Sequence, residues 1–270
     1  MNITYLRTEV LRTFRVPRFY IFTLAMPLVL YVMLSGIYGN DTVDGAAVLD
    51  QVTLLVIPKV NPDGAERFRR ENYDPDCSGA FCVPGRGFDV NRWHDSAVDP
   101  AVDPAANPAA KPVPEAAAVQ RVFRQYRPAM VVDYHHQGSY VSADGDLITA
   151  SIFWPNTSGV PAPAITLSKQ MCVVISDTLM HYGFAEVSQY PGTLPRGIAR
   201  NAYGLQGAGS VLVELRGDIG QKSAGMLTRT AYAVMASLLE AIAEGTVYAA
   251  DPARAEQIPL RGQAIDDPHE

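Results

Sequence analysis

Apolar positions along this chain follow two kinds of pattern. Runs of consecutive apolar residues, many of them β-branched, are typical of strands buried on both faces, and they predict strands at 52–57, 129–134, 148–154 and 211–215. Apolar positions three and four residues apart are typical of helices that cover a sheet, and they predict helices at 115–126, 164–182 and 226–244. Strands that alternate with helices indicate an α/β fold with a mainly parallel or mixed sheet and helices on both faces.

An apolar run near the N-terminus predicts a membrane anchor. Residues 19–38 carry no charge and are long enough for a helix that crosses a bilayer. Four arginines precede the run, and the next charged residue after it is Asp41. By the positive-inside rule, 1–18 is then a basic cytoplasmic lead-in, 19–38 is one transmembrane helix, and the rest is extracytoplasmic. A cleaved signal peptide is the alternative, although the run is longer than the usual apolar part of such a peptide.

The first forty residues also resemble the amino-terminal end of ABC transporter permease subunits, where a basic lead-in precedes the first membrane span. A permease needs several further apolar spans, and none follows in the sequence. A transporter-associated membrane subunit is therefore a hypothesis that rests on this segment alone.

Prolines mark the limits of the expected globular domain. The repeated Ala-Val-Asp-Pro within 97–114 excludes a helix or a central strand, which predicts an extended surface insertion. Asn61-Pro62-Asp63-Gly64 predicts a turn. The stretch 247–270 is rich in proline and charge, and we expect a frayed tail there. The domain is thus expected at 46–246.

Charge and cysteine content exclude some classes of function. The net charge is −6 and the pI about 5.4, which argues against a nucleic acid partner because phosphate binding needs a basic face. Cys77 and Cys82 could close a small disulfide in an exported domain, whereas Cys172 lies in an apolar helical stretch that indicates a buried thiol. No spacing of a structural zinc site is present.

Three segments carry candidate chemistry. Asn91 and Arg92 suit a carboxylate ligand, since the guanidinium donates two parallel hydrogen bonds and the amide adds a third. His135 follows an apolar run and is a natural metal ligand. Glu214 lies in a run of valine and leucine, where an apolar setting raises the pKa of a carboxyl and suits it for general base and acid catalysis.

These segments, with Asn-Pro-Asp-Gly before them, resemble in order and spacing the zinc metallocarboxypeptidases of the carboxypeptidase A type. The bacterial members with a segment like Asp133-Tyr134-His135-His136-Gln137-Gly138 are the most similar. The resemblance covers about 46–246. It implies a Zn²⁺ cofactor with His135 as its last protein ligand, Glu214 as the catalytic carboxylate, and a peptide substrate whose free C-terminal carboxylate is bound by Asn91 and Arg92.

The resemblance implies roles for further residues. Arg70 matches by position the arginine that stabilises the developing oxyanion, and Arg69 lies one residue away from that position. Tyr190 fits the mobile tyrosine that covers the substrate, and Tyr203 is the alternative. Arg200 lies where the family shapes the pocket for the last side chain, and a cation there would favour an acidic residue.

The sequence departs from this family at the first zinc motif, His-x-x-Glu. None of the five histidines begins that motif, and its expected position falls in the apolar N-terminal segment. One ligand does not make a zinc site. The sequence therefore predicts a metallocarboxypeptidase-like domain with impaired zinc-dependent removal of C-terminal residues. The alternative is a non-catalytic, membrane-anchored binder of peptide or cell-wall C-terminal carboxylates. If zinc binds nonetheless, the first groups to test are His94, His136, Asp133 and Asp95.

Overall fold

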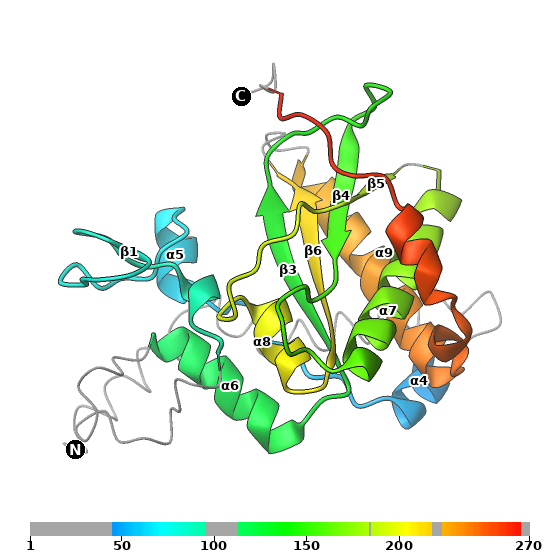
Figure 1. Cartoon of the computed structure of the whole chain (residues 1–270), viewed down its shortest axis with the longest axis horizontal. Helices are drawn as coiled ribbons and strands as arrows, with labels where there is room; N and C mark the ends of the chain where they lie inside the picture. The colour runs from blue at the N-terminus through cyan, green and yellow to red at the C-terminus, as the bar shows by residue number, and fades with distance from the viewer. Residues whose placement is uncertain (1–44, 96–112, 184, 218–222, 266–270) are drawn as a thin grey trace. The chain divides into compact units, whose positions relative to one another are not determined.

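The computed structural model describes residues 45–95, 113–183, 185–217 and 223–265 (Figure 1). The chain divides into two compact units, Met1–Pro58 and Lys59–Glu270. None of the helices in the described ranges is long and apolar enough to cross a membrane. The predicted transmembrane helix at 19–38 lies outside the described residues, as does 96–112 of the predicted insertion.

The described part of the first unit holds the helix α4 (Gly45–Gln51) and the stretch 52–58. The prediction of a buried strand at 52–57 is wrong, because this run has no regular secondary structure and Val56 is 52% exposed. A β-branched run becomes a buried strand only where a neighbouring strand pairs with it, and no described strand does so here.

A four-stranded sheet forms the centre of the second unit. Its strands are β3 (Met130–Gln137), β6 (Gly209–Arg216), β4 (Ile148–Phe153) and β5 (Glu186–Gln189), adjacent in that order. The β3–β6 and β4–β5 pairs are parallel, whereas β6 and β4 are antiparallel. The sheet is therefore mixed, and His135 lies inside β3 rather than after it.

Helices cover both faces of this sheet, as the sequence predicts. On one face, Val211, Val213 and Leu215 of β6 join the main apolar core with α7 (Ala162–His181) and α9 (Ser223–Ala243) (Figure 1). On the other, a smaller cluster packs Val131 of β3 against α6 (Pro114–Tyr126) and α8 (Ala199–Leu205). The three predicted helices are confirmed within a few residues as α6, α7 and α9, while the sequence did not indicate α8 or β5.

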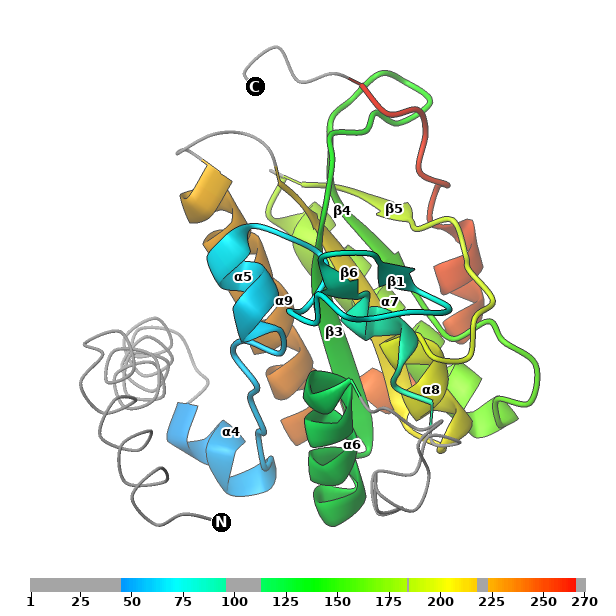
Figure 2. The same cartoon turned by 90° about the vertical axis from the view of Figure 1, so that its left-hand side faces the viewer.

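The prediction of a frayed tail is wrong for residues up to 265. The short helices η5 (Thr246–Ala249) and η6 (Pro252–Gln257) place Val247, Ala255 and Ile258 in the main core. The following residues then run beside β5 and the loop between β3 and β4, as the red trace shows in Figures 1 and 2. Burial of these apolar side chains holds a proline-rich segment that has little regular structure of its own.

Residues 59–95 are built from short elements. Asn61 caps α5 (Pro62–Arg67) by accepting a hydrogen bond from the Gly64 amide at 2.9 Å, so the predicted turn is the start of a helix. A two-stranded ribbon of β1 (Cys82–Val83) and β2 (Gly87–Phe88) follows, and the Cys77–Cys82 disulfide is formed. The ribbon leads into η3 (Val90–Arg92), which carries two candidate site residues.

Candidate active site

A row of polar side chains crosses the sheet on the face opposite the main core. His135 on β3 is the register partner of Glu214 on β6, Glu214 is the partner of Ser151 on β4, and Ser151 is the partner of Ser188 on β5. Side chains alternate between the faces of a strand, and the neighbours of Glu214, Val213 and Leu215, lie in the core. These four polar side chains therefore lie on one face of the sheet.

Asn91 joins this row to the segment before α6. Asp89 caps η3 by accepting a hydrogen bond from the Asn91 amide N–H at 3.1 Å. The Asn91 side chain contacts two groups of β3, His135 Nε2 at 2.9 Å and Asp133 Oδ2 at 3.4 Å, and its Oδ1 accepts from the Ala199 amide at 2.8 Å. Two motifs that lie 44 residues apart thus meet. The Nδ2 atom of Asn91 contacts β3 and its Oδ1 atom accepts from α8, so both ends of the side-chain amide have partners within the protein.

His135 forms an ion pair with Asp133, which lies two residues earlier on the same face of β3. Their Nε2 and Oδ2 atoms are 2.9 Å apart. The Asp133 carboxylate raises the pKa of His135 to about 9, against the effect of burial. Burial is the largest single effect on Asp133 and raises its pKa, but the charge and hydrogen bond of His135, with smaller contributions from His94 and Arg200, together make the net shift downward. Each group of the pair therefore favours the charged form of the other.

Glu214 is a buried carboxyl, 9% exposed, that faces this ion pair. Burial raises its pKa, and the positive charges of His135, Arg261 and Arg70 oppose the shift without reversing it. A carboxyl with a raised pKa can take up and return a proton near neutral pH, which is the property of a general base and acid.

Two arginines share one carboxylate beside the row. Arg70 Nε donates to Asp89 Oδ2 at 2.8 Å, and Arg92 Nη1 lies 3.4 Å from the same oxygen and donates to the Asn91 carbonyl at 2.7 Å. Burial lowers the pKa of Arg70, but the hydrogen bond and the charge of Asp89 raise it, and the net shift is upward. Asp89 thus pairs with both arginines, of which Arg70 also acts on Glu214, and this part of Asp89 was not predicted from the sequence.

Tyr190 lies between two arginines. Its ring centroid is 5.9 Å from the Arg200 guanidinium and 4.7 Å from that of Arg261. Arg200 is only 1% exposed, and its Nη2 donates to the Thr193 carbonyl at 2.9 Å and to Asn156 Oδ1 at 3.1 Å. Burial lowers its pKa to about 10. As described, Arg200 is sealed in the protein rather than open to a ligand.

The alternative tyrosine, Tyr203, is buried away from solvent. Its hydroxyl lies 2.9 Å from His94 Nδ1, and its ring stacks on Phe123. Burial lowers the pKa of His94 to about 4 and raises that of Tyr203. This neutral buried pair links the chain just after η3 to α8 and leaves Tyr190 as the better placed of the two tyrosines.

A zinc site is not assembled from the described residues. Within 45–95, 113–183, 185–217 and 223–265, no group of three or more His, Cys, Asp or Glu side chains could hold a metal ion. His136 is exposed and alternates to the opposite face from His135, and Asp95 pairs with Arg196 at 3.4 Å. The groups present near His135 do not fit the three-ligand geometry that a catalytic zinc needs.

One functional candidate, Arg261, was missed entirely from the sequence. It lies in the segment expected to be a frayed tail, and no motif marks it. Asp133 was named only as a substitute zinc ligand, although its position two residues before His135 on a strand was enough to place both on one face.

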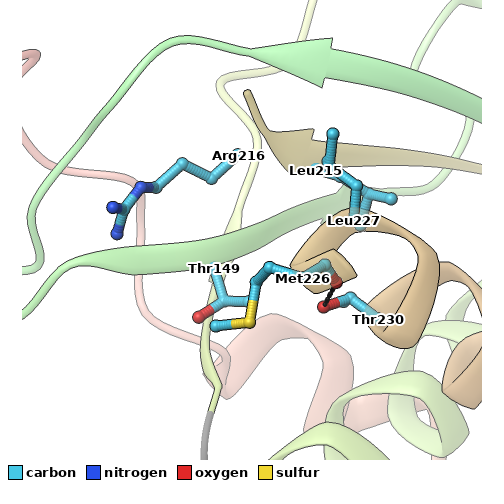
Figure 3. A pocket seen from close by; sticks show the side chains of 6 residues that line it. All are labelled: Thr149, Leu215, Arg216, Met226, Leu227 and Thr230. Carbon is cyan, nitrogen blue, oxygen red and sulfur yellow. Dashed lines mark hydrogen bonds between the residues drawn. The ribbon is translucent and has the colours of Figure 1, made fainter. Parts of the chain in front are cut away.

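A small hollow lies between the sheet and α9. Its lining residues come from β4, β6 and α9, as Figure 3 shows: Thr149, Leu215, Arg216, Met226, Leu227 and Thr230. Thr230 Oγ1 donates to the Met226 carbonyl at 2.9 Å along its wall.

Comparison with known proteins identifies one family. A model of the family described as zinc carboxypeptidase matches residues 25–218, which is more than half of the chain. The matched range begins inside the apolar N-terminal run and contains every candidate site residue predicted from the sequence. No curated protein and no solved structure matches the chain.

Proposed function

The chain belongs to the zinc carboxypeptidase family, and from that premise we propose that its site binds peptides by their free C-terminal carboxylate. Zinc-dependent removal of the last residue is the activity that the family implies. We propose that this activity is impaired here, because the sequence lacks His-x-x-Glu and the described residues assemble no alternative zinc site.

One observation carries this proposal, the contact of 2.9 Å between Asn91 Nδ2 and His135 Nε2. It joins the Asn91-Arg92 pair to the face of the sheet that carries Glu214, although the two segments are far apart in sequence. Cationic donors and a buried carboxyl with a raised pKa thus lie in one site. This is the combination expected where a substrate carboxylate binds beside a proton acceptor.

Each side chain has a distinct part in the proposed site. Arg92 pairs with the substrate carboxylate in exchange for its contact with Asp89, and Asn91 orients η3 against β3. Arg70, with its charge held by Asp89, faces the carbonyl of the last peptide bond. Glu214 accepts and returns a proton.

A non-catalytic binding domain is the second candidate. The ion pair of His135 with Asp133 favours it, because both groups satisfy each other at 2.9 Å without a metal. The same carboxylate-binding residues serve both candidates, so a zinc titration with a turnover assay separates them.

We also propose that 19–38 anchors the chain in a membrane, with the domain outside the cytoplasm. The support is the distribution of arginines before an uncharged run. A phosphatase reporter fused after residue 45 is expected to be active only outside the cytoplasm, and activity confined to the cytoplasm would exclude both the anchor and the signal peptide.

Calorimetric titration with a peptide and its C-terminally amidated form tests the binding function. Arg92→Ala is expected to weaken binding of the free peptide by about 1.5 to 3 kcal/mol, the range for a hydrogen bond to a charged group, which is roughly 10- to 150-fold. Binding of the amidated peptide should change little. Arg254→Ala is the control, since Arg254 pairs with Asp177 on an exposed surface. Equal losses for both peptides would show that Arg92 is only structural.

A further inference from the structure

The C-terminal segment delivers an arginine to the edge of the proposed site. Arg261 N–H donates to the Gln189 carbonyl at 3.0 Å, and the Val141 N–H donates to the Gln263 carbonyl at 3.1 Å. These bonds hold the segment against β5 and the loop after β3, as Figures 1 and 2 show. Arg261 lies outside the residues that match the family, 25–218.

The Arg261 side chain is held between two aromatic rings. Its guanidinium carbon is 3.7 Å from the centroid of Tyr140 and 4.7 Å from that of Tyr190. Its Nη1 donates to Gln137 Oε1 at 2.9 Å. Gln137 ends β3 and is two residues beyond His135, so it lies on the same face as the polar row.

Two buried donors at this point have no acceptor. Arg261 Nε and Gln137 Nε2 make no hydrogen bond among the described residues, and Gln137 is only 7% exposed. The amide orientation of Gln137 is settled by chemistry, because a guanidinium only donates and must face Oε1. Buried donors are nearly always paired in folded proteins, so two adjacent unpaired ones indicate a ligand with acceptor oxygens.

The charge of Arg261 is also uncompensated at short range. No ion pair joins it to a carboxylate in the described part of the chain, whereas Arg70, Arg92, Arg196 and Arg254 each have one. The guanidinium of Arg261 is already held against two tyrosine rings, so it loses little conformational entropy when it binds an anion.

We propose that Arg261, together with Gln137, binds a carboxylate of the peptide substrate. The carboxylate is either the α-carboxylate of the C-terminus or an acidic side chain near it. This inference rests on the proposed peptide-binding function and adds to it a residue contributed by the C-terminal segment. Tyr140 and Tyr190 position the guanidinium.

Four peptides that differ at two positions test the inference with the full chain. They end in Glu or Gln, and each is prepared with a free or an amidated C-terminus. Arg261→Gln is expected to weaken binding by about tenfold or more for the peptides that keep the recognised carboxylate. A loss confined to free C-termini identifies the α-carboxylate, and a loss confined to peptides ending in Glu identifies the side chain.

Matched variants separate this role from a structural one. Arg254→Gln removes an arginine from the same C-terminal segment and is expected to leave all four affinities unchanged. Arg261→Lys keeps the charge but loses the fork, and is expected to retain part of the selectivity. Equal loss for all four peptides with Arg261→Gln, or no loss for any, overturns the inference, since a variant that only loosens the segment has no reason to distinguish carboxylates.

The test also separates this inference from the function on which it rests. If Arg92→Ala discriminates free from amidated peptide while Arg261→Gln does not discriminate at all, only the inference fails. If the unmodified chain binds none of the four peptides, both fail.

Discussion

His135 and Glu214 occupy the same register position on two adjacent parallel strands, β3 and β6. Their side chains therefore point to the same face of the sheet, away from the core that Val213 and Leu215 help to form. A cationic imidazole and a buried carboxyl become neighbours through the pairing of two strands that are distant in sequence. This relationship underlies the first two predictions.

Glu214→Gln is expected to stabilise the folded chain at pH 7. The pKa of Glu214 is raised in the fold, so its contribution to stability is full below the pKa of an unfolded glutamate and is lost as the pH rises through the folded value. At pH 7 the charged form therefore opposes folding, and glutamine removes that cost. Urea unfolding at pH 7 and pH 4 measures it, and the gain should vanish at pH 4. A smaller gain in the free energy of unfolding at pH 7 than at pH 4 would contradict the prediction. The control is Glu66→Gln, at an exposed ion pair.

Zinc is expected to bind weakly, with little zinc-dependent removal of C-terminal residues. A catalytic zinc takes three protein ligands, and the described residues offer no group that could hold the metal. His135→Ala and His136→Ala should have similarly small effects on zinc affinity, measured by competition with a chromophoric chelator. Tight binding of one zinc, lost in His135→Ala but not in His136→Ala and accompanied by turnover, would refute this.

His94 is expected to make stability depend on pH between about 4 and 6.5. Its pKa is about 4 in the fold because the ring is buried, whereas an unfolded histidine titrates near 6.5. The unfolded chain alone takes up the proton in that window, so stability is full above pH 6.5 and falls as the pH drops, by roughly 3 kcal/mol in total. His94→Gln should remove this loss while keeping a partner for Tyr203. If the free energies of unfolding of the two proteins change in parallel with pH in urea unfolding, His94 does not cause the loss of stability.

Val56→Asp is expected to change the free energy of unfolding by less than about 0.5 kcal/mol, since Val56 is exposed. Val213→Asp, which buries a charge in the core of the sheet, should cost at least about 3 kcal/mol. Chemical denaturation of both variants at neutral pH measures the contrast. A loss for Val56→Asp as large as that for Val213→Asp would mean that 52–57 is a buried strand, as the apolar pattern predicts.

Local patterns were enough to predict the α/β class, the helices α6, α7 and α9, and the strands β3, β4 and β6. In each, the spacing of apolar residues already records which face is buried. The same pattern failed at 52–57, because an apolar run shows only that a strand could be buried and does not supply its partner. It failed in the opposite sense after 247, where proline and charge obscured the apolar anchors Val247, Ala255 and Ile258.

The sequence alone determined which residues have the chemistry of the site: Asn91, Arg92, His135 and Glu214 are evident from their motifs and their apolar surroundings. Only the tertiary structure decided how they are arranged. Strand register places His135 beside Glu214, the Asn91 amide is bonded to β3 and α8, and Arg200 is sealed inside the protein. Arg261 reaches the site because core burial and backbone bonds hold the last described segment beside β5. Pairing and burial depend on contacts between distant segments, and no local pattern of side chains specifies such contacts.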